Sequence, residues 1–315
     1  MTIKHILFIG GAGFIGSNLI KGIGYDDVEI HVVEPHGAYL QRLNDTSVIM
    51  HECTLSETDS IKKIIEDCKI DPVVHLVSTL IPGSSYEDYK NEYKHMIFPS
   101  IELMEICAEK GILFVYFSSG GTIYGNRNDV LPFVETDPMS PISYYGWSKQ
   151  MMENSILFIH RTKGLKYLIL RPSNPYGHGQ NLFGKQGLVA VAIGKILRGN
   201  PIEVWGDGSA VRDYIYIDDL ANVFSHLLNK DVHNTTLNIG SGRGYSVNDV
   251  LAFLKIVSQK EFKIIYQNPR PVDVSTMVLN VERLSQYVDI KFTPFMEGIK
   301  QFYKESIIDY SHKKL

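Results

Sequence analysis

The feature that most constrains the fold is a glycine-rich turn near the N-terminus, with glycines at Gly10, Gly13 and Gly16. It follows an apolar run at residues 3–10, which predicts a buried strand, and it opens a helical pattern that continues to about residue 23. Glycine allows a tight turn and a close approach of the backbone to a ligand, and the start of a helix offers free N–H groups to an anion. A strand, a glycine turn and a helix in this order are typical of a site for the pyrophosphate of a dinucleotide.

The rest of the first half alternates short apolar runs with helical patterns. These predicted strands and helices cover residues 28–34, 56–68, 72–78, 97–111 and 113–119. Ser56 is expected to cap the helix that it begins. Continuous apolar strands between helices predict a parallel sheet covered on both faces, so we expect an α/β fold with a Rossmann-type doubly wound parallel sheet. From about residue 181 the regular alternation of predicted strands and helices stops, which predicts a smaller mixed α/β region at the carboxyl edge of the sheet.

An acidic residue, Glu34, ends the second predicted strand, 24 positions after Gly10. A carboxylate at this place accepts hydrogen bonds from the 2′-hydroxyl of a ribose and repels a 2′-phosphate. The pattern therefore favours NAD over NADP as the dinucleotide. The alternative is a solvated carboxylate at a strand end, and His36 and Arg42 are near enough in the chain to alter the preference.

Composition argues against several classes of partner. The net charge is −4 and no basic stripe is present, which argues against nucleic acid. The longest later apolar run, residues 73–81, is far shorter than the ~20 residues that a membrane span needs, so we expect a cytoplasmic protein that does not bind membranes. The cysteines, Cys53, Cys68 and Cys107, are widely spaced, which predicts a reducing compartment and no metal site.

Two adjacent tyrosines precede a lysine in the middle of the chain. Ser143 is expected to cap a helix, which places Tyr145 and Lys149 four residues apart on one face and turns Tyr144 elsewhere. An ammonium near a phenol stabilises the phenolate and lowers its pKa. Tyr145 is therefore the candidate acid/base, and Lys149 is the group expected to tune it.

Five ordered segments, "GGAGFIGSNL", "SSGGTIYG", "YYGWSK", "RPSNPYG" and "RDYIYIDDL", resemble the extended short-chain dehydrogenase/reductase family. The branch is that of the NAD-dependent nucleotide-sugar epimerases and dehydratases, typified by UDP-galactose 4-epimerase. The resemblance implies a nucleotide-sugar 4-epimerase acting on UDP-glucose and UDP-galactose, or on their N-acetyl or uronate counterparts. It also implies a homodimer. In such enzymes the residue matching Tyr145 takes a proton from a sugar hydroxyl while hydride moves from the same carbon to NAD, and hydride then returns to the other face of the 4-keto sugar.

The resemblance also implies which residues bind the cofactor and the substrate. NAD would contact Gly10, Gly13, Phe14, Ile15, Gly16, Glu34, Leu76, Tyr145, Lys149 and Pro172. The nucleotide sugar would contact Ser119, Tyr145, Asn174, Leu188, Glu203, Trp205, Arg212, Arg270 and Asp273. Arginine suits a diphosphate because its planar fork makes bidentate contacts, although Arg212 also has a local salt bridge with Asp213 as an alternative role. The NAD-binding domain would cover 1–171 with return segments at about 213–240, and the substrate-binding region would cover 172–212 and 241–315.

The chain departs from the family pattern at Gly120, where epimerases of this type usually carry a Ser or Thr that contacts the substrate. Ser119 and Thr122 are the candidate catalytic hydroxyls in its place. Gly121 and Thr122 also stand where 4,6-dehydratases carry an Asp-Glu pair, which argues against dehydration. A uronate decarboxylase and a keto-sugar reductase remain alternatives, although such a reductase usually takes NADPH. A non-catalytic nucleotide-sensing protein is disfavoured because such proteins often lose the Tyr-Lys pair.

Overall fold

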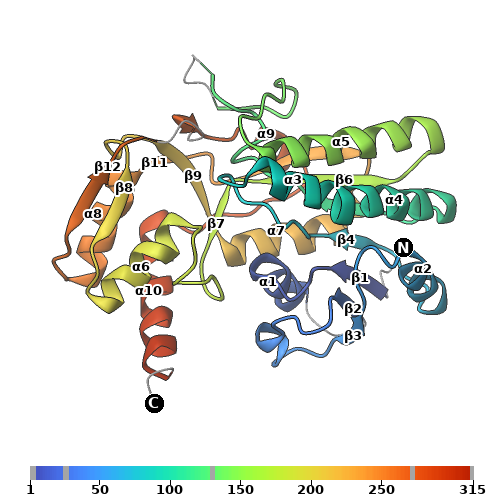
Figure 1. The fold of residues 1–315 in the computed structure, drawn as a ribbon, viewed down its shortest axis with the longest axis horizontal. Helices are drawn as coiled ribbons and strands as arrows, with labels where there is room; N and C mark the ends of the chain where they lie inside the picture. Colours follow the sequence, from blue (N-terminus) through green and yellow to red (C-terminus); the bar gives the residue numbers. More distant parts are fainter. Residues whose placement is uncertain (1–4, 24–27, 128–131, 270–273, 313–315) are drawn as a thin grey trace.

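The computed structural model describes residues 5–23, 28–127, 132–269 and 274–312. Its main sheet has seven parallel strands in the order β10-β6-β5-β4-β1-β2-β3 (Figure 1). Their bounds are β1 His5–Ile9, β2 Glu29–Glu34, β3 Ile49–Glu52, β4 Val73–His75, β5 Phe114–Phe117, β6 Tyr167–Pro172 and β10 Thr235–Ile239. The chain winds outward from β1 in one direction and from β4 in the other. The carboxyl ends of β1 and β4 therefore flank the point where strand order reverses, which is where doubly wound sheets bind ligands.

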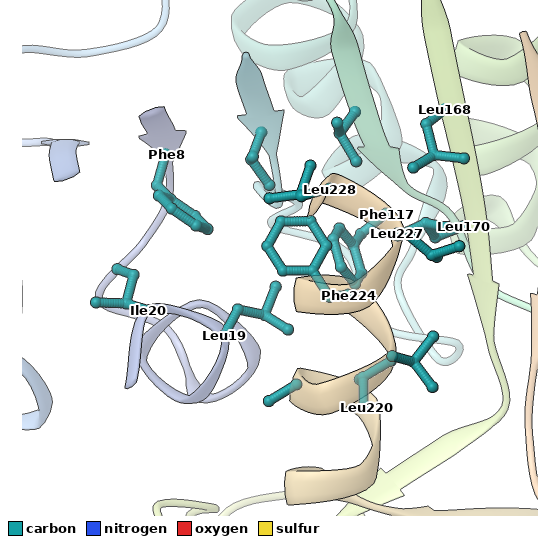
Figure 2. Close-up of a cluster of buried hydrophobic side chains, with 14 of the residues drawn as sticks. Phe8, Leu19, Ile20, Phe117, Leu168, Leu170, Leu220, Phe224, Leu227 and Leu228 are labelled. Carbon is teal, nitrogen blue, oxygen red and sulfur yellow. The ribbon is translucent and has the colours of Figure 1, made fainter. Parts of the chain in front are cut away.

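Helices cover both faces of this sheet because its strands are apolar on both sides. Ile6 and Phe8 of β1 lie in a core with two helices, α1 (Phe14–Ile23) and α7 (Ile217–Asn229), and Figure 2 shows Phe224 and Leu227 of α7 packed in it. Leu7 and Ile9 face the opposite core, which contains residues of α2 (Thr58–Asp67), α4 (Phe98–Lys110) and α5 (Tyr144–Lys163). The predicted doubly wound α/β fold is confirmed.

A smaller region with its own core lies at one end of the molecule (Figure 1). Its central strand β9 (Val211–Tyr216) pairs in parallel with β7 (Asn174–Tyr176) and β13 (Thr276–Met277) and antiparallel with β11 (Gly244–Ser246). Strands β8 (Ile202–Trp205) and β12 (Ile264–Gln267) pair in a second small sheet. Three helices complete the region: α6 Leu188–Arg198, α8 Val247–Ser258 and α10 Phe295–His312. The predicted mixed α/β region is confirmed.

The chain crosses between the two parts more than once. After β9, residues 217–239 return to the main sheet, where α7 packs on α1 and β10 pairs with β6. The division into a cofactor-binding domain and a substrate-binding region, with the boundaries given above, stays a prediction. The remaining short elements are a 3-10 turn at Gln41–Leu43, α3 at Tyr86–Glu92, a π-helical turn at Tyr93–Ile97 and α9 at Glu282–Ser285.

One predicted helix cap is wrong. Helix α2 begins at Thr58 with Glu57 in the cap position, and the Ser56 hydroxyl instead donates to the carbonyl oxygen of His95. The Glu57 carboxylate accepts a hydrogen bond from the Thr54 amide at 2.6 Å, which holds a turn ahead of the helix. Among the described residues, no helix combines the length and apolar character that crossing a membrane requires.

Candidate active site

Helix α5 presents the candidate catalytic pair. The Ser143 hydroxyl accepts a hydrogen bond from the Gly146 amide at 3.1 Å, so Ser143 is the predicted N-cap. The Nζ atom of Lys149 lies 5.7 Å from the centre of the Tyr145 ring, as expected for residues one turn apart. Tyr144 is partly exposed and stacks on Tyr89, with ring centres 5.4 Å apart. Helix geometry thus separates the two tyrosines as predicted.

Lys149 is buried against the carboxyl end of β5. Its ammonium donates a hydrogen bond to the carbonyl oxygen of Phe117 at 2.9 Å, and only 3% of the residue is exposed. Burial lowers the pKa of Lys149 to about 8, against an opposing effect of the nearby carboxylates of Glu92 and Glu153. At neutral pH the fold therefore holds this charged amine out of contact with water.

The pKa of the Tyr145 phenol is raised, chiefly by burial and further by the charge of Glu92, whereas interaction with the Ser119 side chain lowers it. The net direction of this shift is opposite to the one expected from Lys149, because burial is its largest cause, and the tuning of Tyr145 by Lys149 stays a prediction. The phenol is thus neutral at neutral pH and donates or accepts hydrogen bonds through its hydroxyl.

The loop after β5 places a second hydroxyl beside the phenol. Ser119 interacts with Tyr145, and the Thr122 hydroxyl donates to the Ser119 oxygen at 3.1 Å. A Cβ atom at Gly120 would lie 2.6 Å from Leu279 and 2.9 Å from the carbonyl oxygen of Arg171. A serine at 120 therefore does not fit this loop without a shift. Of the two candidate hydroxyls, Ser119 is adjacent to Tyr145 and Thr122 lies one hydrogen bond further away.

The glycine turn lies where β1 meets α1. Gly10 has a φ of +84°, which favours glycine, and a Cβ at Gly16 would lie 2.6 Å from the carbonyl oxygen of Gly11. The Glu34 carboxylate, at the end of β2, accepts a hydrogen bond from the Ala12 amide at 2.6 Å, while burial raises its pKa. The acid therefore lies against the turn. Because the strands are parallel, four more predicted cofactor residues lie at the same edge of the sheet. Phe14 and Ile15 begin α1, Leu76 directly follows β4, and Pro172 ends β6.

Sequence reasoning missed one buried acid, Glu92, at the end of α3. Its carboxylate accepts hydrogen bonds from the Ser78 hydroxyl and the Thr79 amide, both at 2.9 Å, and also from the Thr79 hydroxyl. Glu92 is only 2% exposed, and its charge raises the pKa values of both Tyr145 and Lys149. An isolated acid in a helical segment gives no sign of burial, so the sequence pattern offers no signal for this residue.

Two of the predicted substrate residues, Asn174 and Arg212, lie on the paired strands β7 and β9. Asn174 begins β7, and a Cβ at Gly121 would lie 3.6 Å from its Oδ1 atom, while its amide donates to the carbonyl oxygen of Asp213 at 2.8 Å. Arg212 lies on β9 and donates to the carbonyl oxygen of Val211 at 2.8 Å. The Asp213 carboxylate accepts hydrogen bonds from Ser241 and Gly242. These bonds, and not a salt bridge with Arg212, fix its position.

The other predicted substrate residues belong to the smaller region. Leu188 begins α6, and Glu203 and Trp205 lie on β8, where the Glu203 carboxylate is 3.8 Å from Lys195 Nζ. Trp205 is half exposed beside a surface depression of about 690 Å³ at the ends of β8 and β12. Arg270 and Asp273 lie outside the described residues.

Comparison with known proteins accounts for this arrangement. Residues 6–240 match the profile of the NAD dependent epimerase/dehydratase family. The chain belongs to this family. It is 31% identical over 284 residues to a dTDP-4-dehydro-6-deoxyglucose reductase of Escherichia coli, a match that covers 88% of this chain and 89% of the relative.

Solved structures of the family superpose closely on the chain. A UDP-glucose 4-epimerase of Thermotoga maritima, solved with UDP-glucose, gives a TM-score of 0.90 at 31% identity and covers 97% of this chain and 99% of its own. A UDP-glucose 4-epimerase of Thermus thermophilus, solved with NAD, gives a TM-score of 0.85 at 26% identity, with 95% of this chain and 98% of that one covered.

The residues of this epimerase/dehydratase fit NAD as the cofactor of the family. The glycine turn leaves no room for side chains at Gly10 and Gly16, and helix α1 starts directly after it with N–H groups available to a diphosphate. Glu34 supplies the acid that suits an unphosphorylated ribose. Tyr145, which is partly buried, and the buried Lys149 lie at the same sheet edge, so the candidate acid/base is beside the residues that fit the cofactor.

Proposed function

We propose that the chain is an NAD-dependent nucleotide-sugar 4-epimerase that acts on UDP-glucose and UDP-galactose or on their N-acetyl or uronate counterparts. The observation that carries the proposal is the chain of hydroxyls from Thr122 through Ser119 to Tyr145, next to a dinucleotide turn. The likeness to a UDP-glucose 4-epimerase over nearly the whole chain supports the nucleotide and the reaction.

In this proposal bound NAD would supply the acceptor for the hydride of the sugar C4 and the source from which that hydride returns. The protein's own residues do the rest of the chemistry. As the phenolate, Tyr145 would take the proton of the C4 hydroxyl and then give it back, and Ser119 would hydrogen-bond the same oxygen while Thr122 orients Ser119. Lys149 supplies positive charge behind the phenol when the phenolate forms. The raised pKa of Tyr145 means that the phenol must lose its own proton before the first step, and the same raised pKa favours return of the proton to the sugar in the last step.

A keto-sugar reductase is the second candidate, since the E. coli relative at 31% identity is named a reductase. The position of Glu34 against the glycine turn favours an unphosphorylated dinucleotide and so supports an epimerase, which recycles its cofactor. The two reactions differ in balance: a reductase consumes one reduced dinucleotide for each product, and an epimerase consumes none.

The test is a panel of UDP-, dTDP- and GDP-sugars incubated with the purified protein and NAD and followed by NMR and mass spectrometry. We expect one UDP-hexose to be converted to its C4 epimer without a change of mass and without net NADH. Tyr145→Phe is expected to retain bound NAD and lose turnover, while Tyr144→Phe, on the outer face of the same helix, serves as the matched control. Turnover only with added NADH or NADPH would instead identify a reductase.

We further propose a homodimer formed through α4 and α5. These two helices pack side by side, and large apolar side chains on them are exposed: Phe98 by 54%, Trp147 by 50% and Phe158 by 56%. Light scattering is expected to give twice the chain mass, and Phe158→Glu should halve it. Ile256→Glu, at a similarly exposed apolar position on α8, should leave the mass unchanged.

We also propose a cytoplasmic location, which the free cysteines Cys53, Cys68 and Cys107 support.

A further inference from the structure

A cluster of metal-ligand side chains lies at the edge of the main sheet formed by β1, β2 and β3. His31 on β2, His51 on β3 and Cys68, which caps the end of α2, offer ligand atoms that all lie within 4.8 Å of one another. They face the side of the sheet that α2 covers, as do Leu7 and Val33. The strands are parallel and the glycine turn follows the carboxyl end of β1, so the first residues of β2 lie at the opposite end of the sheet from that turn.

The two histidines already direct nitrogen atoms at each other. His31 Nδ1 lies 2.9 Å from His51 Nε2, and their rings stack with centres 5.2 Å apart. Zinc bound tetrahedrally at about 2.0–2.1 Å from each nitrogen and about 2.3 Å from sulfur requires N···N and N···S separations of roughly 3.3–3.6 Å. Ligand atoms at 2.9 Å and within 4.8 Å reach those separations by shifts of the order of 1 Å.

The other nitrogen of His31 has the partner that metal-bound histidines usually have. His31 Nε2 lies 2.8 Å from a Glu29 carboxylate oxygen, and His5 Nδ1 lies 3.3 Å from the same oxygen. A carboxylate that accepts the Nε2 proton fixes the tautomer of the imidazole and leaves the lone pair on Nδ1. That lone pair points at His51 Nε2. The ring is nearly fully buried, so its orientation is held by packing as well.

We propose that His31, His51 and Cys68 form a transition-metal site with Zn²⁺ as its best-fitting occupant and Glu29 as the carboxylate that orients His31. Two imidazoles and one thiolate are ligands that zinc prefers, and Cys68 and His51 are partly exposed, which leaves a fourth position for water. Binding replaces the Cys68 thiol proton by a sulfur–zinc bond and releases that proton to solvent. The site joins two strands to the end of α2, so metal binding is expected to stabilise this edge of the sheet. It does not depend on the proposed epimerase activity.

The test is titration of the purified, chelator-treated full chain with Co²⁺, followed by absorption and by competition with Zn²⁺. We expect one Co²⁺ per chain, a thiolate-to-cobalt charge-transfer band, the visible bands of four-coordinate cobalt, and displacement by Zn²⁺ with a higher unfolding temperature. Cys68→Ser should remove the charge-transfer band and weaken binding at least about tenfold. Glu29→Gln should keep the band and weaken binding by about 10- to 100-fold.

The control is His233→Asn, which removes an exposed histidine outside the cluster and should leave binding unchanged. The absence of saturable Co²⁺ binding would overturn the proposal. Binding that persists unchanged in Cys68→Ser, or a cobalt spectrum without a thiolate band, would also overturn it, the latter by placing the metal on His5, Glu29 and His31 instead. These readouts do not involve sugar turnover, so a failed metal site and a failed epimerase proposal are distinguishable.

Discussion

Replacement of the buried lysine, Lys149→Met, is expected to stabilise the nucleotide-free protein while abolishing turnover. The pKa of Lys149 falls from its ordinary 10.5 to about 8 on folding. At 1.36 kcal/mol for each pKa unit, holding the charged amine in the fold costs about 3 kcal/mol at pH 7. Methionine removes this cost and fills a similar volume. It also leaves the Phe117 carbonyl without its 2.9 Å donor, a loss of about 1–1.5 kcal/mol. The expected net gain in the free energy of unfolding is about 2 kcal/mol.

The difference in the free energy of unfolding between Lys149→Met and the wild type must fall as pH rises. Because the folded pKa is below the unfolded one, the unfolded chain binds more protons between pH 8 and 10.5, and the stability of the wild type rises across that window. The advantage of the variant is therefore full below about pH 8 and disappears before pH 10.5, where the lost hydrogen bond to the Phe117 carbonyl leaves the variant less stable than wild type. Urea unfolding at several pH values measures it, with exposed Lys21→Met on α1 as the charge-matched control. A variant that is less stable than wild type at pH 7, or a stability difference equal at pH 7 and 10.5, would refute the reasoning.

Three further predictions concern the site. Ser119→Ala should lower kcat by about 10²–10⁴-fold and Thr122→Val by roughly tenfold, because only the first hydroxyl contacts the phenol; the reverse order in steady-state kinetics would contradict the structure. Glu92→Gln removes a charge that raises the pKa of the catalytic phenol, so the rising limb of the kcat–pH profile should move to lower pH, and an unmoved limb would show that this acid has no electrostatic role. Gly16→Ala places a Cβ 2.6 Å from backbone, so calorimetry should show weaker NAD binding, whereas Gly83→Ala, with open space around it, should bind NAD normally.

The sequence predicts those parts of the molecule that depend on local pattern. The glycine turn, the apolar strands and the Ser143 cap each follow from a few neighbouring residues, and together they predict the doubly wound sheet and the common face of Tyr145 and Lys149. Distances between segments do not follow in the same way. The choice between Ser119 and Thr122 depends on how the loop after β5 folds against Tyr145, and the pKa of the phenol depends on a burial that helical spacing does not reveal.

The same reason explains the features that sequence reasoning missed. Glu92 comes close to the candidate catalytic pair because α3 packs beside the loop that carries Ser78 and Thr79. The prediction of no metal site stays untested, and cysteine spacing cannot indicate the ligands proposed above, because they come from three separate segments and two of them are histidines. Ligand sets of this kind are assembled by strand order and become visible only in the fold.

Isotope retention in the sugar tests the central claim most directly. UDP-galactose carrying deuterium at C4 is incubated with the protein and NAD in ordinary water, and the UDP-glucose formed is examined by NMR and mass spectrometry; the N-acetyl and uronate substrates are treated in the same way. Transient oxidation and return of the same hydride predict full retention of deuterium at C4, with no exchange into solvent and no accumulation of NADH. Loss of the label to water, or no C4 epimer from any of these UDP-sugars, would contradict the account.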